Sequence, residues 1–255
     1  MKTGREKLIA LSVMLNGDWR VIYDYIVQRK YLDENVMNMS LSMNYDCLTL
    51  IDEEYPEVIK NKHQPPFVIY YEGNIELLTK SEWAHIGILN DTLASNYAVD
   101  STIKIAKDLI NERVFVIPYS SKKNGEIIKK IIKNGGKAIV ILDKGIGSVN
   151  CDDSELYEEL KTNHLILSTY PQNVARKDTN TQITAVNLLS SICNEILVGG
   201  VSDRTPQSTA IGFGLAGGST IFCIPFPMGS NYMNNQLIRE GAVLVESGND
   251  ILEER

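Results

Sequence analysis

Two patterns of hydrophobic and polar positions alternate along most of this chain. Short runs rich in Val, Ile and Leu predict strands, and longer segments with apolar residues at helical spacing predict amphipathic helices between them. We expect strands at residues 47–51, 67–71, 84–89, 114–117, 137–142, 165–168, 195–198, 220–224 and 242–245. We expect helices at residues 96–111, 125–134, 152–162, 181–193 and 208–216.

This alternation predicts an α/β fold, a doubly wound Rossmann-like, mostly parallel sheet, because parallel neighbours are joined by right-handed crossover helices. Helical spacing at residues 5–13 and 19–28 predicts a small N-terminal helical element. The predicted division is therefore an N-terminal element over residues 1–44 and a main domain over residues 45–255.

Ligands of such sheets bind at the carboxyl ends of the strands, near the point where the strand order reverses. The loops expected to hold a functional site are therefore those that follow the strands. They are residues 90–96, 118–124, 144–151, 169–181, 199–208 and 225–235.

The net charge of −7 and the pI near 5.1 argue against a surface covered with phosphate-binding cations, but they allow a local basic cleft. The apolar run near the N-terminus is interrupted at Asn16, Gly17 and Asp18, and no small-residue cleavage signature follows it. A signal peptide or membrane span is therefore not predicted, and we expect a cytoplasmic protein that does not bind membranes.

The residue types that usually supply catalysis or metal binding are scattered. The cysteines show no C-x-x-C spacing and are predicted to be buried, reduced thiols; they are Cys47, Cys151, Cys193 and Cys223. His63, His85 and His164 also lack metal-ligand spacing. A G-x-G-x-x-G pattern at residues 212–217 falls inside a predicted helix, so its glycines are expected to permit close packing. We expect no metal, no cofactor and no catalytic residues.

Two segments near opposite ends of the chain share an order of features with a known family. Residues 48–77, LTLIDEEYPEVIKNKHQPPFVIYYEGNIEL, join a short strand, a Tyr-Pro turn, a Pro-Pro entry and a second strand. Residues 236–254 read QLIREGAVLVESGNDILEE. These segments resemble the opening and the ending of the DprA/Smf family of bacterial DNA-processing proteins. The resemblance implies a protein that binds single-stranded DNA, protects it and transfers it to RecA without a catalytic step.

The first phosphate-binding motif of that family, G-S-R-x-x-S-x-Y-G, is only partly present. Ser95 and Tyr97 match it, whereas residues 90–92, Asn-Asp-Thr, replace its glycine, first serine and arginine. The carboxylate of Asp91 should repel a phosphate by roughly 1 kcal/mol or more, and loss of the arginine removes a bidentate donor. The resemblance therefore implies weakened phosphate contacts at this loop.

The second family motif, S-G-x-A-x-G-I-D, falls on residues 117–124 and loses both glycines and the aspartate. Ser120, Ser121, Lys122 and Lys123 stand there instead. The two lysines are interpreted either as a phosphate-tracking surface or as part of a solvated face, and the sequence leaves both open.

The remaining two motifs are fainter. Asn187 occupies the asparagine position of R-N-R-I-I-A-G-L, but Val186 and Leu188 replace the arginines. Ser208 and Thr209 echo S-G-S-L-I-T-A, and they also fit an ordinary helix N-cap.

Single-strand binding requires positive charge and aromatic stacking platforms. The predicted loops offer both; the residues are Lys122, Lys123, Arg176, Lys177, Arg204, Tyr97, Tyr119 and Tyr170. Because the family arginines are missing, we expect weaker and more salt-sensitive DNA binding than is usual in the family.

The C-terminal segment implies a homodimer, since the family uses this region for its dimer contact. Asn235, Ile238 and Leu244 are the implied interface residues. Periodicity alone equally allows Ile238 and Leu244 to be core residues of the last helix and strand.

Two other functions remain open. One is a diverged paralogue that keeps the scaffold and the dimer but acts as an interaction protein or a sensor of a nucleotide ligand. The other is a hydrolase that uses Asp91, suggested only by a carboxylate in a ligand-binding loop.

Overall fold

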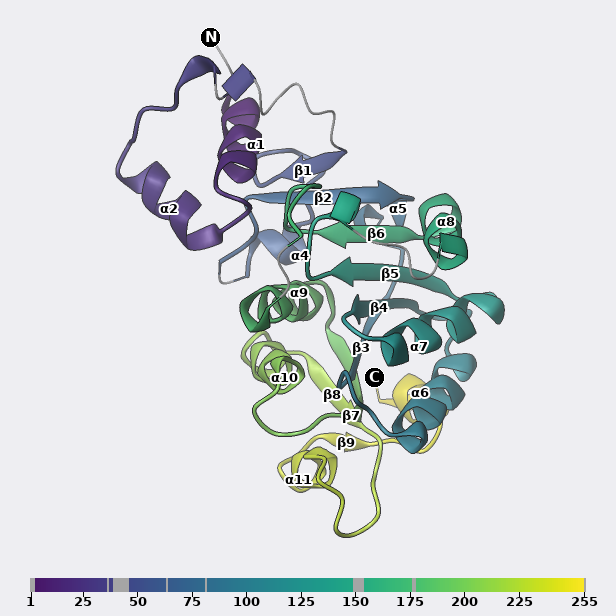
Figure 1. The fold of residues 1–255 in the computed structure, drawn as a ribbon. Coiled ribbons are helices and arrows are strands. Elements are labelled where there is room, and N and C mark those ends of the chain that lie inside the picture. The colour runs from purple at the N-terminus through teal and green to yellow at the C-terminus, as the bar shows by residue number, and fades with distance from the viewer. Residues whose placement is uncertain are drawn as a thin grey trace.

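The computed structural model describes residues 3–35, 37–38, 46–62, 64–80, 82–148, 154–175 and 178–254 (Figure 1). Within these residues one sheet has nine strands in the order β1-β2-β6-β5-β4-β3-β7-β8-β9. The strands are β1 (Cys47–Thr49), β2 (Val68–Gly73), β3 (His85–Asn90), β4 (Val114–Tyr119), β5 (Lys137–Leu142), β6 (Leu165–Ser168), β7 (Glu195–Gly200), β8 (Thr220–Cys223) and β9 (Val243–Leu244). From β6 to β9 in the sheet order, neighbouring strands run parallel. At the other end of the sheet, β1 pairs antiparallel with β2, and β2 pairs antiparallel with β6. The predicted doubly wound, mostly parallel sheet is confirmed.

Helices cover both faces of the sheet (Figure 1). One buried cluster joins it to α6 (Asn96–Asp108), α7 (Lys122–Lys133), α8 (Ser154–Asn163) and α12 (Asn249–Glu253). A second cluster, on the other face, joins it to α4 (Glu57–Lys60), α5 (Glu76–Thr79), α9 (Thr179–Ile192), α10 (Pro206–Ala216) and α11 (Asn234–Arg239). A short 3₁₀ helix, η1, spans Ile146–Ser148.

Three helices, α7, α9 and α10, begin two or three residues earlier than the sequence pattern predicted. Helix α7 begins at Lys122, because the hydroxyl of Ser121 accepts a hydrogen bond from the Asn124 amide at 3.2 Å and caps the helix. Helix α10 begins at Pro206, because Thr205 and Ser208 form a capping box. Lys122 and Lys123 therefore lie in a first helical turn, and Ser208 is the third residue of its helix.

The glycines of α10 serve different purposes. A Cβ on Gly214 would lie 2.6 Å from the end of the Ile196 side chain, so that side chain would have to shift to admit a larger residue in α10. At Gly212 a Cβ would meet no atom within 4 Å, so the prediction that this residue permits close packing was wrong.

The N-terminal element consists of α1 (Gly4–Met14) and α2 (Trp19–Val27), and it packs against the β1–β2 edge of the sheet (Figure 1). The Trp19 indole N–H donates to the Pro65 carbonyl at 2.8 Å, and its ring stacks on Phe67 with centroids 5.4 Å apart. The buried Tyr70 hydroxyl donates to the Ser12 hydroxyl at 2.9 Å. The predicted boundary between residues 44 and 45 lies outside the described residues, so the division into two domains stays a prediction.

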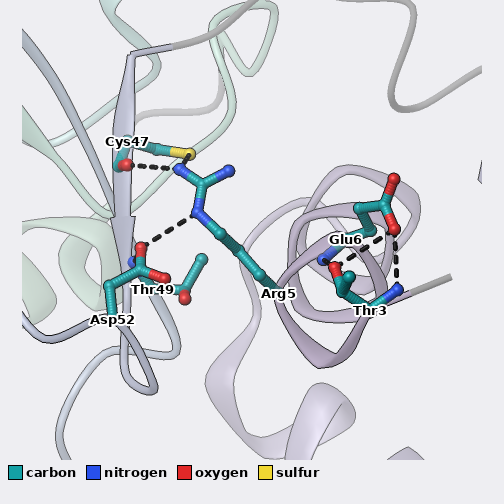
Figure 2. Close-up of polar contacts among 6 residues, drawn as sticks. All are labelled: Thr3, Arg5, Glu6, Cys47, Thr49 and Asp52. Carbon is teal, nitrogen blue, oxygen red and sulfur yellow. Dashed lines mark hydrogen bonds and ion pairs between the residues drawn. The ribbon is translucent and has the colours of Figure 1, made fainter.

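Arg5 connects α1 to the first strand (Figure 2). Its guanidinium donates to the Asp52 carboxylate at 3.1 Å and to the Cys47 carbonyl at 3.0 Å. The same Asp52 carboxylate accepts a hydrogen bond from the Thr49 amide at 2.8 Å. One ion pair therefore fixes both the helix and the backbone of β1.

Candidate functional site at the carboxyl edge of the sheet

The strand order reverses between β3 and β7, and a cavity of about 440 Å³ lies at their carboxyl ends. Its lining comes from the loops after these strands, from the starts of α9 and α10 and from the loop before α11. The lining residues are Asp91, Thr92, Leu93, Gln182, Ser202, Thr205, Pro206, Gln207, Asn231 and Tyr232. Among these described residues one carries a negative charge and none is Lys or Arg. The cavity is the position at which doubly wound sheets bind ligands.

Glycine at the end of β7 allows the two central strands to come close. A Cβ on Gly199 would lie 2.2 Å from the Thr102 hydroxyl and 2.5 Å from the Asn90 amide group. Asn90 is fully buried and donates to the Thr102 hydroxyl at 3.1 Å. The carboxyl ends of β3 and β7 are therefore packed against α6 through a tight polar layer that a larger residue at position 199 would disrupt.

Asp91 joins the loops that follow β3 and β7. Its backbone N–H donates to the Gly200 carbonyl at 2.9 Å, and its Oδ2 accepts from the Ser202 amide at 2.8 Å. The side chain is only 8% exposed, and Oδ1 has no hydrogen-bond partner. The acidic residue singled out in the sequence thus has a structural role at the switch point and also contributes one unsatisfied acceptor.

Four helices begin around this edge. Hydroxyl groups cap α6 (Ser95), α7 (Ser121) and α10 (Thr205), and the carboxylate of Asp178 caps α9. The Lys123 ammonium donates to the Asn96 side-chain oxygen at 2.7 Å, which places the starts of α6 and α7 side by side. The positive ends of helix dipoles favour anions. This part of the edge is therefore more favourable to phosphate than the acidic cavity next to it.

An aromatic cluster lies beside the cavity. Tyr97 contacts Phe226 edge-to-face at a centroid distance of 5.1 Å, and Phe226 contacts Tyr232 at 4.6 Å. The Tyr97 hydroxyl donates to the Pro225 carbonyl at 3.0 Å, and the Tyr232 hydroxyl accepts from the Ser95 amide at 2.8 Å. Tyr97 remains about half exposed, so one surface of this cluster is open to a stacking partner.

The structure brings most of the predicted DNA-binding residues to this edge, but several of their hydroxyls are already hydrogen-bonded. Ser120 and Ser121 donate to the Asn124 side-chain oxygen at 3.1 and 2.7 Å. Ser208 and Thr209 donate to the Thr205 carbonyl at 2.8 and 3.3 Å. Their positions near the site are consistent with the prediction, but the hydroxyls serve helix capping.

Asn187 lies elsewhere. It lines a cavity of about 90 Å³ together with Ser12 and Trp19 of the N-terminal element and Phe67 at the start of β2. The described structure therefore does not bring Asn187 into the cavity at the switch point.

The other charged and aromatic candidates are distributed unevenly. Arg204 is strongly exposed and pairs with Asp203 at 3.4 Å. Tyr119 is half-buried and Tyr170 is buried, and Arg176 and Lys177 lie outside the described residues. Lys122 is exposed in the first turn of α7.

The predicted dimer residues have mixed environments. The Asn235 amide donates to the Phe226 carbonyl at 2.6 Å and accepts from the Phe226 N–H at 2.9 Å, so its polar atoms are used within the chain. Ile238 is half-buried against the core, whereas the Leu244 side chain is exposed on the edge strand β9.

The sequence interpretation missed Asn234, which organises the edge from within. It is completely buried, and its amide donates to the carbonyls of Val198, Gly199 and Ile224 at 3.0, 3.2 and 2.9 Å. Its Oδ1 accepts from the Val201 amide at 3.3 Å. The only sequence signal was its place in a run rich in Gly and Asn, residues 229–235.

Among the described residues, no group of three or more His, Cys, Asp or Glu side chains is arranged to hold a metal ion. Cys47, Cys193 and Cys223 are buried free thiols, and burial raises the pKa of Cys223 to about 12. Burial lowers the pKa of His85, whose Nε2 lies 2.7 Å from the Leu77 carbonyl. Cys151 and His63 lie outside the described residues. None of the described helices is both long and apolar enough to cross a bilayer.

Comparisons with known proteins agree on one family. DNA processing protein DprA of Streptococcus pneumoniae is 24% identical over 214 residues, which cover 82% of this chain and 74% of that protein. DprA of Bacillus subtilis is 21% identical over 213 residues, which cover 82% and 71%. The X-ray structure of S. pneumoniae DprA has a TM-score of 0.80 at 20% identity, covering 100% of this chain and 99% of that chain.

DNA processing protein A from Helicobacter pylori, a solved structure that concerns the single-stranded DNA binding mode of that protein, is also similar. Its TM-score is 0.71 at 15% identity. It covers 82% of this chain and 95% of that one. The model of the family DNA recombination-mediator protein A matches residues 46–255. The chain therefore belongs to the DNA recombination-mediator protein A family, which includes the DprA and Smf proteins.

Proposed function

We propose that this protein binds single-stranded DNA at the carboxyl edge of its sheet and acts as a DNA-processing protein in recombination and transformation. The observation that supports this most directly is that helices α6 and α7 begin side by side, where their positive ends favour a phosphate. Lys123 of α7 donates to Asn96 of α6, and Lys122 is exposed beside them. Family membership and the single-strand binding of the H. pylori relative support the same function. The proposal involves no catalytic step.

In this proposal the protein binds the phosphates of DNA more weakly than is usual in the family. The switch-point cavity presents the Asp91 carboxylate and, among its described lining residues, no cation. A backbone phosphate is therefore better placed near Lys122 and the start of α7 than in the cavity. The strand would pass over the half-exposed Tyr97, where a base can stack.

Anisotropy titrations with a labelled oligothymidine at several salt concentrations test this proposal. Replacing Lys122 and Lys123 by alanine should weaken DNA binding. The slope of the logarithm of the association constant against the logarithm of the salt concentration should become less negative by about 1.4, because each phosphate contact on a single strand contributes about 0.7. The matched control is K130A/K133A, which removes the same charge from the last turn of the same helix and should change the slope less. Tight binding that is insensitive to the K122A/K123A change would contradict the proposal.

Transfer of the DNA to RecA, a cytoplasmic location and a homodimer belong to the same proposal, and the family resemblance is their support. For the dimer, the exposed Leu244 on edge strand β9 adds a structural reason. Sedimentation of the wild type and of L244E tests this part, since a charged side chain at the interface should give monomers while leaving the fold unchanged.

A second candidate is the diverged paralogue that senses a nucleotide ligand. The absence of Lys and Arg from the described residues that line the switch-point cavity argues against DNA binding there, and the cavity volume of about 440 Å³ lies in the range of small-molecule sites. No DNA binding at low salt, together with thermal stabilisation by a nucleotide, would select this candidate over the first.

A further inference from the structure

A small cavity lies between the N-terminal element and the main sheet. Its volume is about 90 Å³, and its walls come from α1 and α2, from the entry to β2 and from one face of α9. The described residues that line it are all different from those that line the switch-point cavity. It is therefore a separate space, at the place where two parts of the chain that are far apart in sequence meet.

One wall of this cavity is aromatic and is fixed by contacts within the protein. Trp19 and Phe67 line it, their rings stack on each other, and the Trp19 indole N–H donates to the Pro65 carbonyl at 2.8 Å. At Gly17, where φ is +71°, a Cβ would lie 2.6 Å from the Thr169 carbonyl oxygen, so the turn before α2 needs glycine to approach this loop. The apolar wall is therefore formed before a ligand arrives, as is usual for small-molecule sites.

Helix α9 presents polar side chains to the same cavity. Thr184, Asn187 and Ser191 are spaced by three and four residues, so they lie on one side of the helix, and that side faces the N-terminal element. The hydroxyls of Thr184 and Ser191 donate to carbonyls one turn back in the helix, at 3.0 and 2.9 Å. Within the part of the chain that the structure describes, no hydrogen bond engages the side-chain amide of Asn187. This amide therefore has both a donor and an acceptor available for a ligand.

These walls restrict the chemistry of the ligand. None of the described lining residues is charged, so a charged ligand would lose its hydration without gaining a partner of opposite sign. A purely apolar ligand would cover the Asn187 amide and leave it unpaired. An amide or lactam edge has an N–H next to a C=O, so it can form both hydrogen bonds with an asparagine amide. Since a cavity of about 150 Å³ holds benzene, about 90 Å³ limits the ligand to a single ring.

We propose that this cavity binds a small neutral molecule, a single ring with an amide or lactam edge that pairs with Asn187 while the ring contacts Trp19 and Phe67. Gln64 lines the cavity and is exposed, so the cavity reaches the surface there and a ligand can enter. The ligand touches the N-terminal element and α9 together, so its binding raises the melting temperature of the protein. The site is independent of the proposed DNA binding.

The first test is an NMR titration of the wild type with 2-pyridone, a six-membered lactam. The chain has two tryptophans, so two indole N–H signals are expected, and the variant W83F assigns them. Trp83 precedes β3 and lies over Lys137, whereas Thr169 of the cavity follows β6, so the two tryptophans lie at opposite edges of the parallel sheet. We expect the Trp19 signal to shift and saturate while the Trp83 signal stays. No saturable shift of Trp19, or equal shifts of both signals, would overturn the proposal.

Two further ligands test the hydrogen-bonding edge in the unaltered protein. Benzene has a ring without a polar edge, and N-methyl-2-pyridone lacks the N–H donor. Each should bind about tenfold more weakly than 2-pyridone, because a buried polar group left unpaired costs about as much as a tenfold loss of affinity. Benzene binding as tightly as 2-pyridone would show that the amide takes no part, and the proposed chemistry would be wrong.

The variant Asn187→Leu tests the residue itself. It should weaken binding of 2-pyridone about tenfold without weakening that of benzene. The matched control is Asn180→Leu, which removes the same amide from an exposed position of the same helix and should leave both affinities unchanged. Unchanged binding of 2-pyridone by N187L would refute the assignment of Asn187. If N187L does not fold, the comparison of the three ligands on the wild type decides the proposal.

Discussion

Asn234 offers the sharpest test of how the site is held together. The change Asn234→Ala removes, from a fully buried position, an NH2 group whose two hydrogens are shared among three carbonyls and an oxygen that accepts from the Val201 N–H. A typical hydrogen bond contributes about 1 kcal/mol net, and stranding a buried donor such as the Val201 N–H costs about 1–3 kcal/mol. Because the backbone carbonyls can relax toward other donors, we expect a net loss of about 3 kcal/mol in the free energy of unfolding.

Urea unfolding followed by circular dichroism measures this loss from the shift in the midpoint. For a chain of this size, about 3 kcal/mol corresponds to a fall in melting temperature of about 6–12 °C. The matched control is Asn231→Ala, an exposed residue of the loop that leads into α11, which should change stability by less than about 0.5 kcal/mol. If Asn234→Ala also stays within 1 kcal/mol of the wild type, the amide does not hold β7, β8 and α11 together as described.

Two further predictions concern buried charge and pH. Arg113 and Glu195 form a bidentate ion pair at 2.7 and 3.1 Å, and the arginine side chain is almost fully buried. Because Arg113→Met leaves the Glu195 carboxylate unpaired, it should lower the free energy of unfolding, measured in urea, by about 3–5 kcal/mol. The double variant R113M/E195L should recover most of that loss. A double variant no more stable than R113M would show that the unpaired carboxylate is not the cause. Burial lowers the pKa of His85 in the folded state, so the unfolded state takes up the proton first as the pH falls. The free energy of unfolding should therefore decrease as the pH drops below about 6.5. Between pH 7 and pH 5, H85Q should lose less stability than the wild type.

The strands could be predicted from sequence because each is a local run of β-branched and aliphatic residues, such as residues 114–117 in β4, bounded by turn residues. Their order could not be predicted from the same pattern. Nothing local shows that β2 lies between β1 and β6 and pairs antiparallel with both, because strand pairing joins residues far apart in the chain.

The candidate site was predicted in outline for a similar reason. The loops at Asp91 and Ser121 follow strands, so the fold alone places them at one edge. Asn187 was assigned by motif position, yet it lies eight residues into α9, about 12 Å along the helix from its start, and it faces the N-terminal element. Asn234 was missed because burial of a polar amide depends on three carbonyls from two strands and their loops, which only the folded structure brings together.

The contacts of Arg5 with β1 affect more than the docking of α1. Strand β1 is an edge strand, and such strands present unpaired N–H and C=O groups to which another chain can add. Here the Cys47 carbonyl accepts from Arg5 and the Thr49 N–H donates to Asp52, so side chains occupy backbone groups that an incoming strand would use (Figure 2). The sheet is thereby protected against growth at its β1 edge, and the proposed homodimer would form at the opposite edge, β9, where Leu244 is exposed.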